Sequence, residues 1–224
     1  EGLFSLFYGL PSNYWPNIKS SHQSPVLLDA LQAHNYQIQL FSSQGLNRPE
    51  LAGSTFSALK NLNMSAQPGG AQGDTQAIQQ WLDWQQTQYA QLPWFNFLYL
   101  NSVAAYDNGR GEAMPEVTEQ SIKQYYYSAA NVLDQKLSSV FEKLKQSGQM
   151  EKTIIIFTSS YANELNDNNN NYWGNGSNFS RYQTQVPLFI SWPERAPSLH
   201  HSDASHNDLV PTLIQDMLAV TSNS

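Results

Sequence analysis

The chain has 224 residues, a formal net charge of −7 from 11 Lys and Arg against 18 Asp and Glu, and no cysteine. A composition of 40% hydrophobic and 12% aromatic residues excludes intrinsic disorder, and the length suits a single α/β domain over residues 1–224. The scarcity of clustered Lys and Arg excludes binding to nucleic acid, which needs a basic patch. The absence of cysteine excludes disulfides, a thiol nucleophile and Cys-ligated zinc.

No apolar run approaches the roughly 20 residues that span a bilayer. The chain starts without the Met and basic segment of a signal peptide, so we expect it to be a piece of a longer protein.

The first half of the chain alternates helix and strand patterns. Ser24, followed by proline, predicts the start of a helix, and the alternation over 36–43 predicts a strand. The Gly-, Pro-, Ser- and Asn-rich residues of about 46–73 predict a long irregular loop. Asp74 is expected to cap the next helix. The apolar run 94–100 predicts a second strand.

The second half continues the alternation. The clearest helix follows Thr118, because its apolar residues recur every three or four positions. The β-branched run 153–157 predicts a buried strand, and a polar loop of about 158–184 precedes another strand at 186–190. The segment Ser205–Asp208 predicts a capping box for the last helix.

Strands that alternate with helices predict an α/β fold with a mostly parallel central sheet and helices on both faces. In such folds the chemistry lies at the carboxyl ends of strands. The segments that follow Leu100 and Phe157, together with residues 200–208, are therefore the places to search for a site.

A cluster of imidazoles and carboxylates lies late in the chain. Its members are His200, His201, Asp203, His206 and Asp208. These residue types ligate divalent ions or transfer protons. The simpler interpretation, which we favour, is a solvated loop in which Asp208 serves the amino terminus of the last helix.

Asp203 and His206 also match the acid and base of a serine hydrolase in which both come from one late loop. Such a site needs a serine on a tight turn, and no Gly-Asp-Ser stands near the start of the chain. Ser159 or Ser160, after the isoleucine-rich strand, is the remaining choice, and we give this triad low weight.

A series of four motifs occurs in order along residues 120–220. The strand 153–157 is followed by Thr-Ser-Ser-Tyr-Ala-Asn at 158–163, then by Trp-Gly-Asn-Gly at 173–176 and by Val-Pro-Leu at 186–188, and the last helix opens with His-Asn-Asp-Leu-Val-Pro-Thr-Leu at 206–213. This layout resembles the sulfatase-like members of the alkaline phosphatase superfamily. Their pattern is Thr-Ser-Asp-His-Gly-Glu, then Trp-Gly-His-Gly, then Val-Pro-Leu, then His-x-Asp-Leu-x-Pro-Thr-Leu.

The opening segment 2–10 and the segment 40–43 are similar to the YejM family of Gram-negative inner-membrane proteins. That resemblance implies a periplasmic domain at the inner membrane with a role in lipopolysaccharide homeostasis. It also implies lipid A or cardiolipin as ligands, and a membrane-embedded regulatory partner that binds through a membrane domain outside this chain.

The chain departs from the family pattern where active members hold a divalent metal. The metal-binding Asp and His fall on Ser160 and Tyr161, and the motif's Glu falls on Asn163. The His of Trp-Gly-His-Gly falls on Asn175, which cannot transfer a proton near neutral pH. The loop where many members place a substrate-binding His includes Ala104 and contains no histidine.

The resemblance further implies that the first strand, the first metal-binding Asp and the nucleophile lie before Glu1. We therefore expect a non-catalytic domain without metal or cofactor that binds or senses its ligand. The alternative is an active metal-dependent phospho- or sulfo-ester hydrolase, or a phosphoethanolamine-type transferase, with His200, His201, Asp203 and His206 as replacement ligands.

Overall fold

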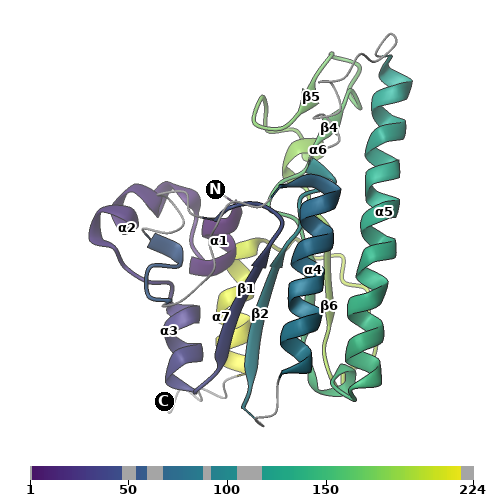
Figure 1. Cartoon of the computed structure of the whole chain (residues 1–224). Coiled ribbons are helices and arrows are strands. Elements are labelled where there is room, and N and C mark those ends of the chain that lie inside the picture. The colour runs from purple at the N-terminus through teal and green to yellow at the C-terminus, as the bar shows by residue number, and fades with distance from the viewer. Residues whose placement is uncertain (1, 47–53, 60–67, 88–91, 105–117, 218–224) are drawn as a thin grey trace.

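The computed structural model describes residues 2–46, 54–59, 68–87, 92–104 and 118–217. Helices lie on both faces of a layer of strands, which confirms the α/β class (Figure 1). The helices are α1 (Gly2–Tyr8), α2 (Trp15–Ser21), α3 (Val26–Ala33), α4 (Gly70–Gln86), α5 (Glu119–Gln146), α6 (Arg181–Thr184) and α7 (His206–Met217). Short 3-10 turns lie at Ser12–Tyr14 and Met150–Lys152.

The strands form three pairs. β1 (Gln37–Ser42) runs parallel to β2 (Trp94–Tyr99), in a register that sets Gln37 beside Trp94 and Ser42 beside Tyr99. β3 (Ile155–Thr158) runs antiparallel to β6 (Leu188–Ser191), which begins at the leucine of the Val-Pro-Leu motif. β4 (Glu164–Leu165) and β5 (Trp173–Gly174) form a small antiparallel pair within the predicted polar loop.

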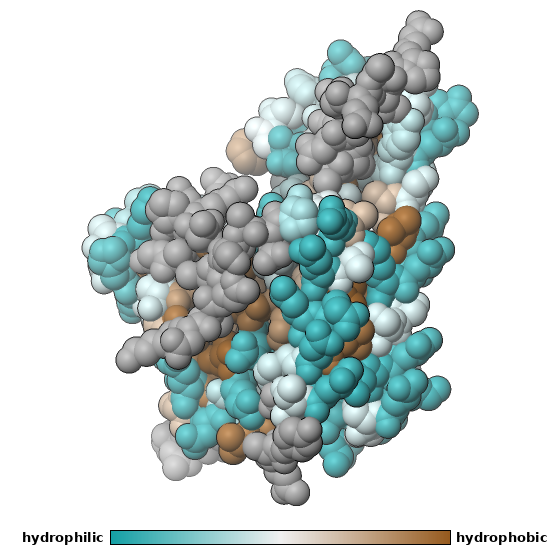
Figure 2. Space-filling model, viewed as in Figure 1, coloured by the Kyte–Doolittle hydropathy of each residue, from teal (hydrophilic) through white to brown (hydrophobic). Residues whose placement is uncertain are grey.

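Two apolar clusters lie on opposite faces of the strand layer. Leu40 and Phe41 are neighbours on β1 and point to opposite faces, as strand geometry requires. The buried members of the first cluster come mainly from α1, α3, β1 and α7: Phe4, Phe7, Tyr8, Leu27, Leu28, Leu31, Leu40, Leu46, Phe56, Val210 and Leu213. The second lies beneath α4 and α5: Phe41, Ala77, Ile78, Trp81, Val140 and Leu144. The outer sides of α4 and α5 are largely hydrophilic (Figure 2).

β3 belongs to the same layer as β1 and β2. Ile154 and Ile156 pack against the first cluster, whereas Ile155 packs against the second. Among the residues that the structure describes, no strand pairing joins β2 to β3. Packing on both faces therefore places the two pairs in one layer without hydrogen bonds between them.

The long helix α5 begins as its sequence predicts. Thr118 accepts a hydrogen bond from the Ser121 amide at 3.2 Å, and the Ser121 hydroxyl accepts one from the Thr118 amide at 3.0 Å. The helix ends beyond Lys145, and Gly148 follows with φ +65, the left-handed conformation that stops helices. Local sequence signals thus define both ends of α5. Packing determines only which sides of the helix are buried.

Two predicted loops contain regular structure, which corrects their limits. α4 begins at Gly70 inside the predicted loop 46–73, so Asp74 lies within the helix instead of capping it. The predicted loop 158–184 contains β4, β5 and α6. Within the described part of the chain, none of the helices combines the length and hydropathy that a membrane span requires.

Candidate functional site

The carboxyl end of β3 brings the first family motif against the start of α7. The Thr158 hydroxyl lies 3.2 Å from Nε2 of His206. Burial lowers the pKa of His206, and hydrogen bonds to the backbone of Gly2 and Ser159 partly oppose this shift. His206 therefore connects β3, α7 and the start of α1, and burial favours its neutral form.

Ser160 lies beside the start of α1. An ideal Cβ on Gly2 would overlap the Ser160 carbonyl oxygen, so only glycine allows this approach. The preceding hydroxyl of Ser159 donates to the carbonyl oxygen of Tyr161 at 2.7 Å. The two positions that the resemblance assigns to a metal-binding Asp and His thus carry a serine packed against backbone and a partly exposed tyrosine.

Two of the other substituted positions contact each other. Nδ2 of Asn175 donates to Oδ1 of Asn163 at 2.9 Å. The fold therefore brings together the Trp-Gly-Asn-Gly segment and the segment that follows β3, as the family motifs imply. The groups that meet there are neutral amides.

Glu164, at the start of β4, is the centre of a hydrogen-bond network that sequence reasoning did not find. Its carboxylate is fully buried and accepts only from uncharged groups. Oε1 accepts from Asn168 at 2.8 Å, and Oε2 accepts from Asn178 at 2.9 Å, Ser180 at 3.1 Å and Gln183 at 2.9 Å. These hydrogen bonds, of which the one from Asn178 has the largest effect, hold the pKa of Glu164 below its usual value, so the carboxylate stays ionised.

Gln183 on α6 extends this network to the backbone. Its Oε1 accepts from the amides of Ser177 at 3.0 Å and Asn178 at 3.3 Å. Its Nε2 donates to the Ser177 hydroxyl at 2.8 Å as well as to Glu164. The lobe formed by β4, β5 and α6, next to one end of α5 in Figure 1, is thus built around a carboxylate and a glutamine.

The late cluster of imidazoles and carboxylates does not converge. His200 is exposed and lies 2.9 Å from the Ser198 hydroxyl, whereas His206 faces β3. Asp208 accepts from the Ser205 amide at 2.7 Å, the helix-start role that we favoured. His201 and Asp203 are exposed. Among the described residues, no three His, Asp or Glu side chains lie where they could hold a metal ion.

The serine-hydrolase geometry does not form either. The hydroxyl opposite Nε2 of His206 belongs to Thr158, and the Ser159 hydroxyl donates a hydrogen bond to the Tyr161 carbonyl oxygen. A nucleophile must lie within hydrogen-bond reach of its base. Among the described residues, the triad of Asp203, His206 and Ser159 is therefore not assembled, and the version with Ser160 stays a prediction.

The carboxyl end of β2 carries a structural cluster instead of a substrate-binding histidine. The buried carboxylate of Asp74 accepts from the amides of Asn101 at 2.9 Å and Ser102 at 3.2 Å. Oδ1 of Asn101 accepts from the Ser43 hydroxyl at 2.8 Å. Asp74 thus fastens α4 to the end of β2, and Ala104 follows in a partly buried turn.

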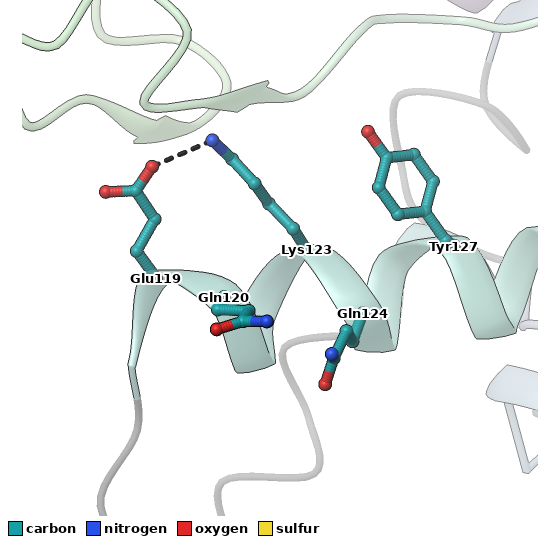
Figure 3. Close-up of a pocket in the computed structure, with 5 residues that line it drawn as sticks. All are labelled: Glu119, Gln120, Lys123, Gln124 and Tyr127. Carbon is teal, nitrogen blue, oxygen red and sulfur yellow. Dashed lines mark hydrogen bonds and ion pairs between the residues drawn. The ribbon is translucent and has the colours of Figure 1, made fainter.

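A surface hollow lies on α5, apart from these segments of β3 and α7. It is lined by Glu119, Gln120, Lys123, Gln124 and Tyr127, all from one side of the helix (Figure 3). Glu119 and Lys123 form an ion pair at 2.8 Å, and Glu119 also accepts from Asn166 of the lobe at 3.1 Å. These contacts hold the lobe against α5 and supply no catalytic group.

Relatives of the chain include membrane proteins and enzymes. Inner membrane protein YejM of Salmonella typhimurium is 29% identical over 224 residues, which are 99% of this chain and 35% of that protein. Choline-sulfatase of Rhizobium meliloti is 30% identical over 101 residues, which are 44% of this chain and 19% of the enzyme. The chain thus spans about a third of the length of the YejM protein.

Solved structures share the fold. A phosphonate monoester hydrolase from Silicibacter pomeroyi matches 96% of this chain and 62% of its own, with a TM-score of 0.70 and 16% identity. A lipoteichoic acid synthase from Listeria monocytogenes matches 100% of this chain and 60% of its own, with a TM-score of 0.66 and 13% identity. A family model described as sulfatase covers residues 1–217, and the chain accordingly belongs to the sulfatase family.

Proposed function

We propose that this chain is a sulfatase-like domain, degenerate at its metal site, of an inner-membrane protein, and that it binds or senses a ligand instead of hydrolysing it. The carrying observation is the chemistry at the substituted positions. Ser160 and Tyr161 offer uncharged hydroxyls, and the Asn175 amide is engaged by Asn163.

A divalent metal does not fit the groups present. Hard divalent cations are bound mainly by carboxylate and carbonyl oxygens, and zinc also by imidazole, and the side chains of Ser160 and Tyr161 supply none of these groups. The nearby carboxylate of Glu164 has both oxygens occupied by four neutral donors. A metal there would have to displace this network.

The relatives support a membrane location, whereas the binding role is proposed from the resemblance to the YejM family. The YejM proteins are named as inner-membrane proteins, which supports a membrane-linked domain. We propose that it lies on the periplasmic face, acts in lipopolysaccharide and outer-membrane lipid homeostasis, and has lipid A or cardiolipin as ligand. A membrane-embedded regulatory protein is the proposed partner, through parts of the protein outside residues 1–224.

Metal content and turnover test this proposal. The purified protein should contain no stoichiometric zinc, manganese or calcium by elemental analysis. It should not hydrolyse p-nitrophenyl phosphate or sulfate when these ions or magnesium are added. Stoichiometric metal with turnover that His206→Ala abolishes would instead establish the metal-dependent hydrolase or phosphoethanolamine-type transferase.

A further inference from the structure

The turn between β5 and α6 presents an unusual apolar side chain. Phe179 is 96% exposed, whereas the other phenylalanines near it in the chain pack at least partly. A phenyl ring offers roughly 150–250 Å² of surface whose burial is favourable. Single exposed apolar residues are common, so the exposure alone does not define a site.

The backbone on both sides of Phe179 is held firmly. Asn178 and Ser180 both donate to Oε2 of Glu164, at 2.9 and 3.1 Å. The Ser180 amide also donates to Oδ1 of Asn178 at 2.7 Å, and the Asn178 amide donates to Gln183 at 3.3 Å. The ring therefore projects from a pre-organised turn, which reduces the entropy lost when a partner covers it.

An uncompensated cation lies two residues further along. Arg181 is exposed, its guanidinium lies 4.9 Å from the centre of the Tyr182 ring, and it donates to the Tyr182 hydroxyl at 3.3 Å. It is the only Lys or Arg in residues 158–184, a range that is described throughout, and no ion pair of Arg181 forms with any described residue. The stacked tyrosine orients the guanidinium and leaves its charge available.

We infer that Phe179 and Arg181 form a lipid-contacting tip, in which the ring enters the interfacial region of a bilayer and the guanidinium binds a lipid phosphate. Guanidinium matches phosphate geometry, and aromatic rings favour the membrane interface. This inference rests on the proposed binding role and names the chemistry of its ligand, a phospholipid or phosphorylated glycolipid.

A bilayer fits this tip better than a protein partner does. The side chains next to the ring, Ser177, Asn178 and Ser180, are small and polar. A stable protein interface buries about 800 Å² per partner, several times what one ring and one guanidinium provide. A bilayer accepts a single inserted ring, and the named relatives are inner-membrane proteins.

The overall charge of −7 opposes attraction to an anionic leaflet, so the cation must act locally. At physiological salt, screening limits the range over which exposed charges interact to about 8 Å. Within the lobe, Glu164 is buried and saturated by its four donors, and the exposed Asp167 accepts from the Leu165 amide at 2.8 Å and forms no ion pair with Arg181. Arg181 can therefore contribute at the point of contact although the domain as a whole is acidic.

Vesicle partition of the purified protein tests the inference, with Phe179→Ala, Arg181→Gln and the control Leu199→Ala. Leu199 is 80% exposed and lies outside the lobe, and the exposure of all three side chains leaves folding unaffected. On phosphatidylethanolamine vesicles with cardiolipin, we expect Phe179→Ala to weaken partition about ten-fold and Arg181→Gln about five-fold. Leu199→Ala should leave it unchanged. Equal partition of all three variants would overturn the inference.

A photo-crosslinking phenylalanine analogue at position 179, with position 199 as control, identifies the occupant directly. Lipid adducts at 179 and not at 199 support the bilayer. Adducts to protein alone, or no adducts at all, would overturn the inference. Metal content and turnover are measured separately, so a failure to find the lipid contact does not affect the proposed absence of catalysis. Hydrolytic activity would refute the proposed absence of catalysis, whichever adducts are found.

Discussion

Replacing Gln183 by methionine should destabilise the lobe, because the shape is kept while the polar contacts are lost. The amide of this buried side chain makes four hydrogen bonds, to Glu164, to the Ser177 hydroxyl and to two backbone amides. At about 1 kcal/mol for each bond in net terms, less for the long contact at 3.3 Å, the loss is about 3–4 kcal/mol. That is a large share of the stability of an ordinary domain.

Urea denaturation and hydrogen exchange measure this effect in complementary ways. Denaturation reports the free energy of global unfolding, whereas exchange at the amides of Ser177 and Asn178 reports opening of the lobe alone. Gln124→Met is the matched control, because that glutamine is exposed on α5, and it should change stability by less than about 0.5 kcal/mol. Gln183→Met with unchanged unfolding and unchanged exchange would refute the structural role of the network.

Three further perturbations test the packing and the titrating groups. Gly73→Ala should cost about 1–3 kcal/mol in urea denaturation, because its Cβ would overlap the Ser43 carbonyl oxygen, whereas Gln76→Ala on the exposed side of α4 should not. The lowered pKa of His206 means that the unfolded state binds more protons than the folded state as pH falls through about 6.5, so the free energy of unfolding should drop there. His206→Gln should remove this part of the pH dependence of stability, whereas the control His200→Gln should keep it. The lowered pKa of Glu164 stabilises the fold above about pH 4.5, and that contribution disappears on acidification. Glu164→Gln should therefore lower stability at neutral pH and flatten the dependence of stability on pH in acid. A steep loss of stability in acid for this variant would contradict the assignment.

The elements that sequence predicts well are those with local signals. β1 was expected from an alternating pattern and β2, β3 and β6 from short apolar runs, and each strand lies within two residues of its predicted start. The helix α5 was expected after Thr118 from its apolar repeat, and the structure adds a cap formed between Thr118 and Ser121, three residues apart. Both kinds of signal depend on neighbours in the chain, which is why they can be recognised without the fold.

The polar centres could not be predicted, because their partners are distant in sequence. Asp74 has the residue type of a helix cap, yet its partners are the amides of Asn101 and Ser102 on another element. Glu164 on β4 and Gln183 on α6 are 19 residues apart with β5 between them, and neither has a local signature. In the His200–Asp208 segment the fold separates the side chains of the candidate cluster, in keeping with the solvated loop that we favoured.

The substituted positions and the Glu164 network are physically consistent with each other. Had the family's metal ligands been lost one at a time, a buried carboxylate or imidazole would remain without its cation, which is strongly destabilising. In this chain Ser160, Tyr161 and Asn175 are neutral, and Asn175 is satisfied by Asn163. The buried carboxylate that follows Asn163 in the chain, Glu164, is satisfied by donors from its own lobe and needs no cation to complete its hydrogen bonds. Restoring one ligand alone, as in Ser160→Asp, should therefore lower stability and not create a metal site, whereas an increase in stability on adding manganese to that variant would show that the site still accepts a metal.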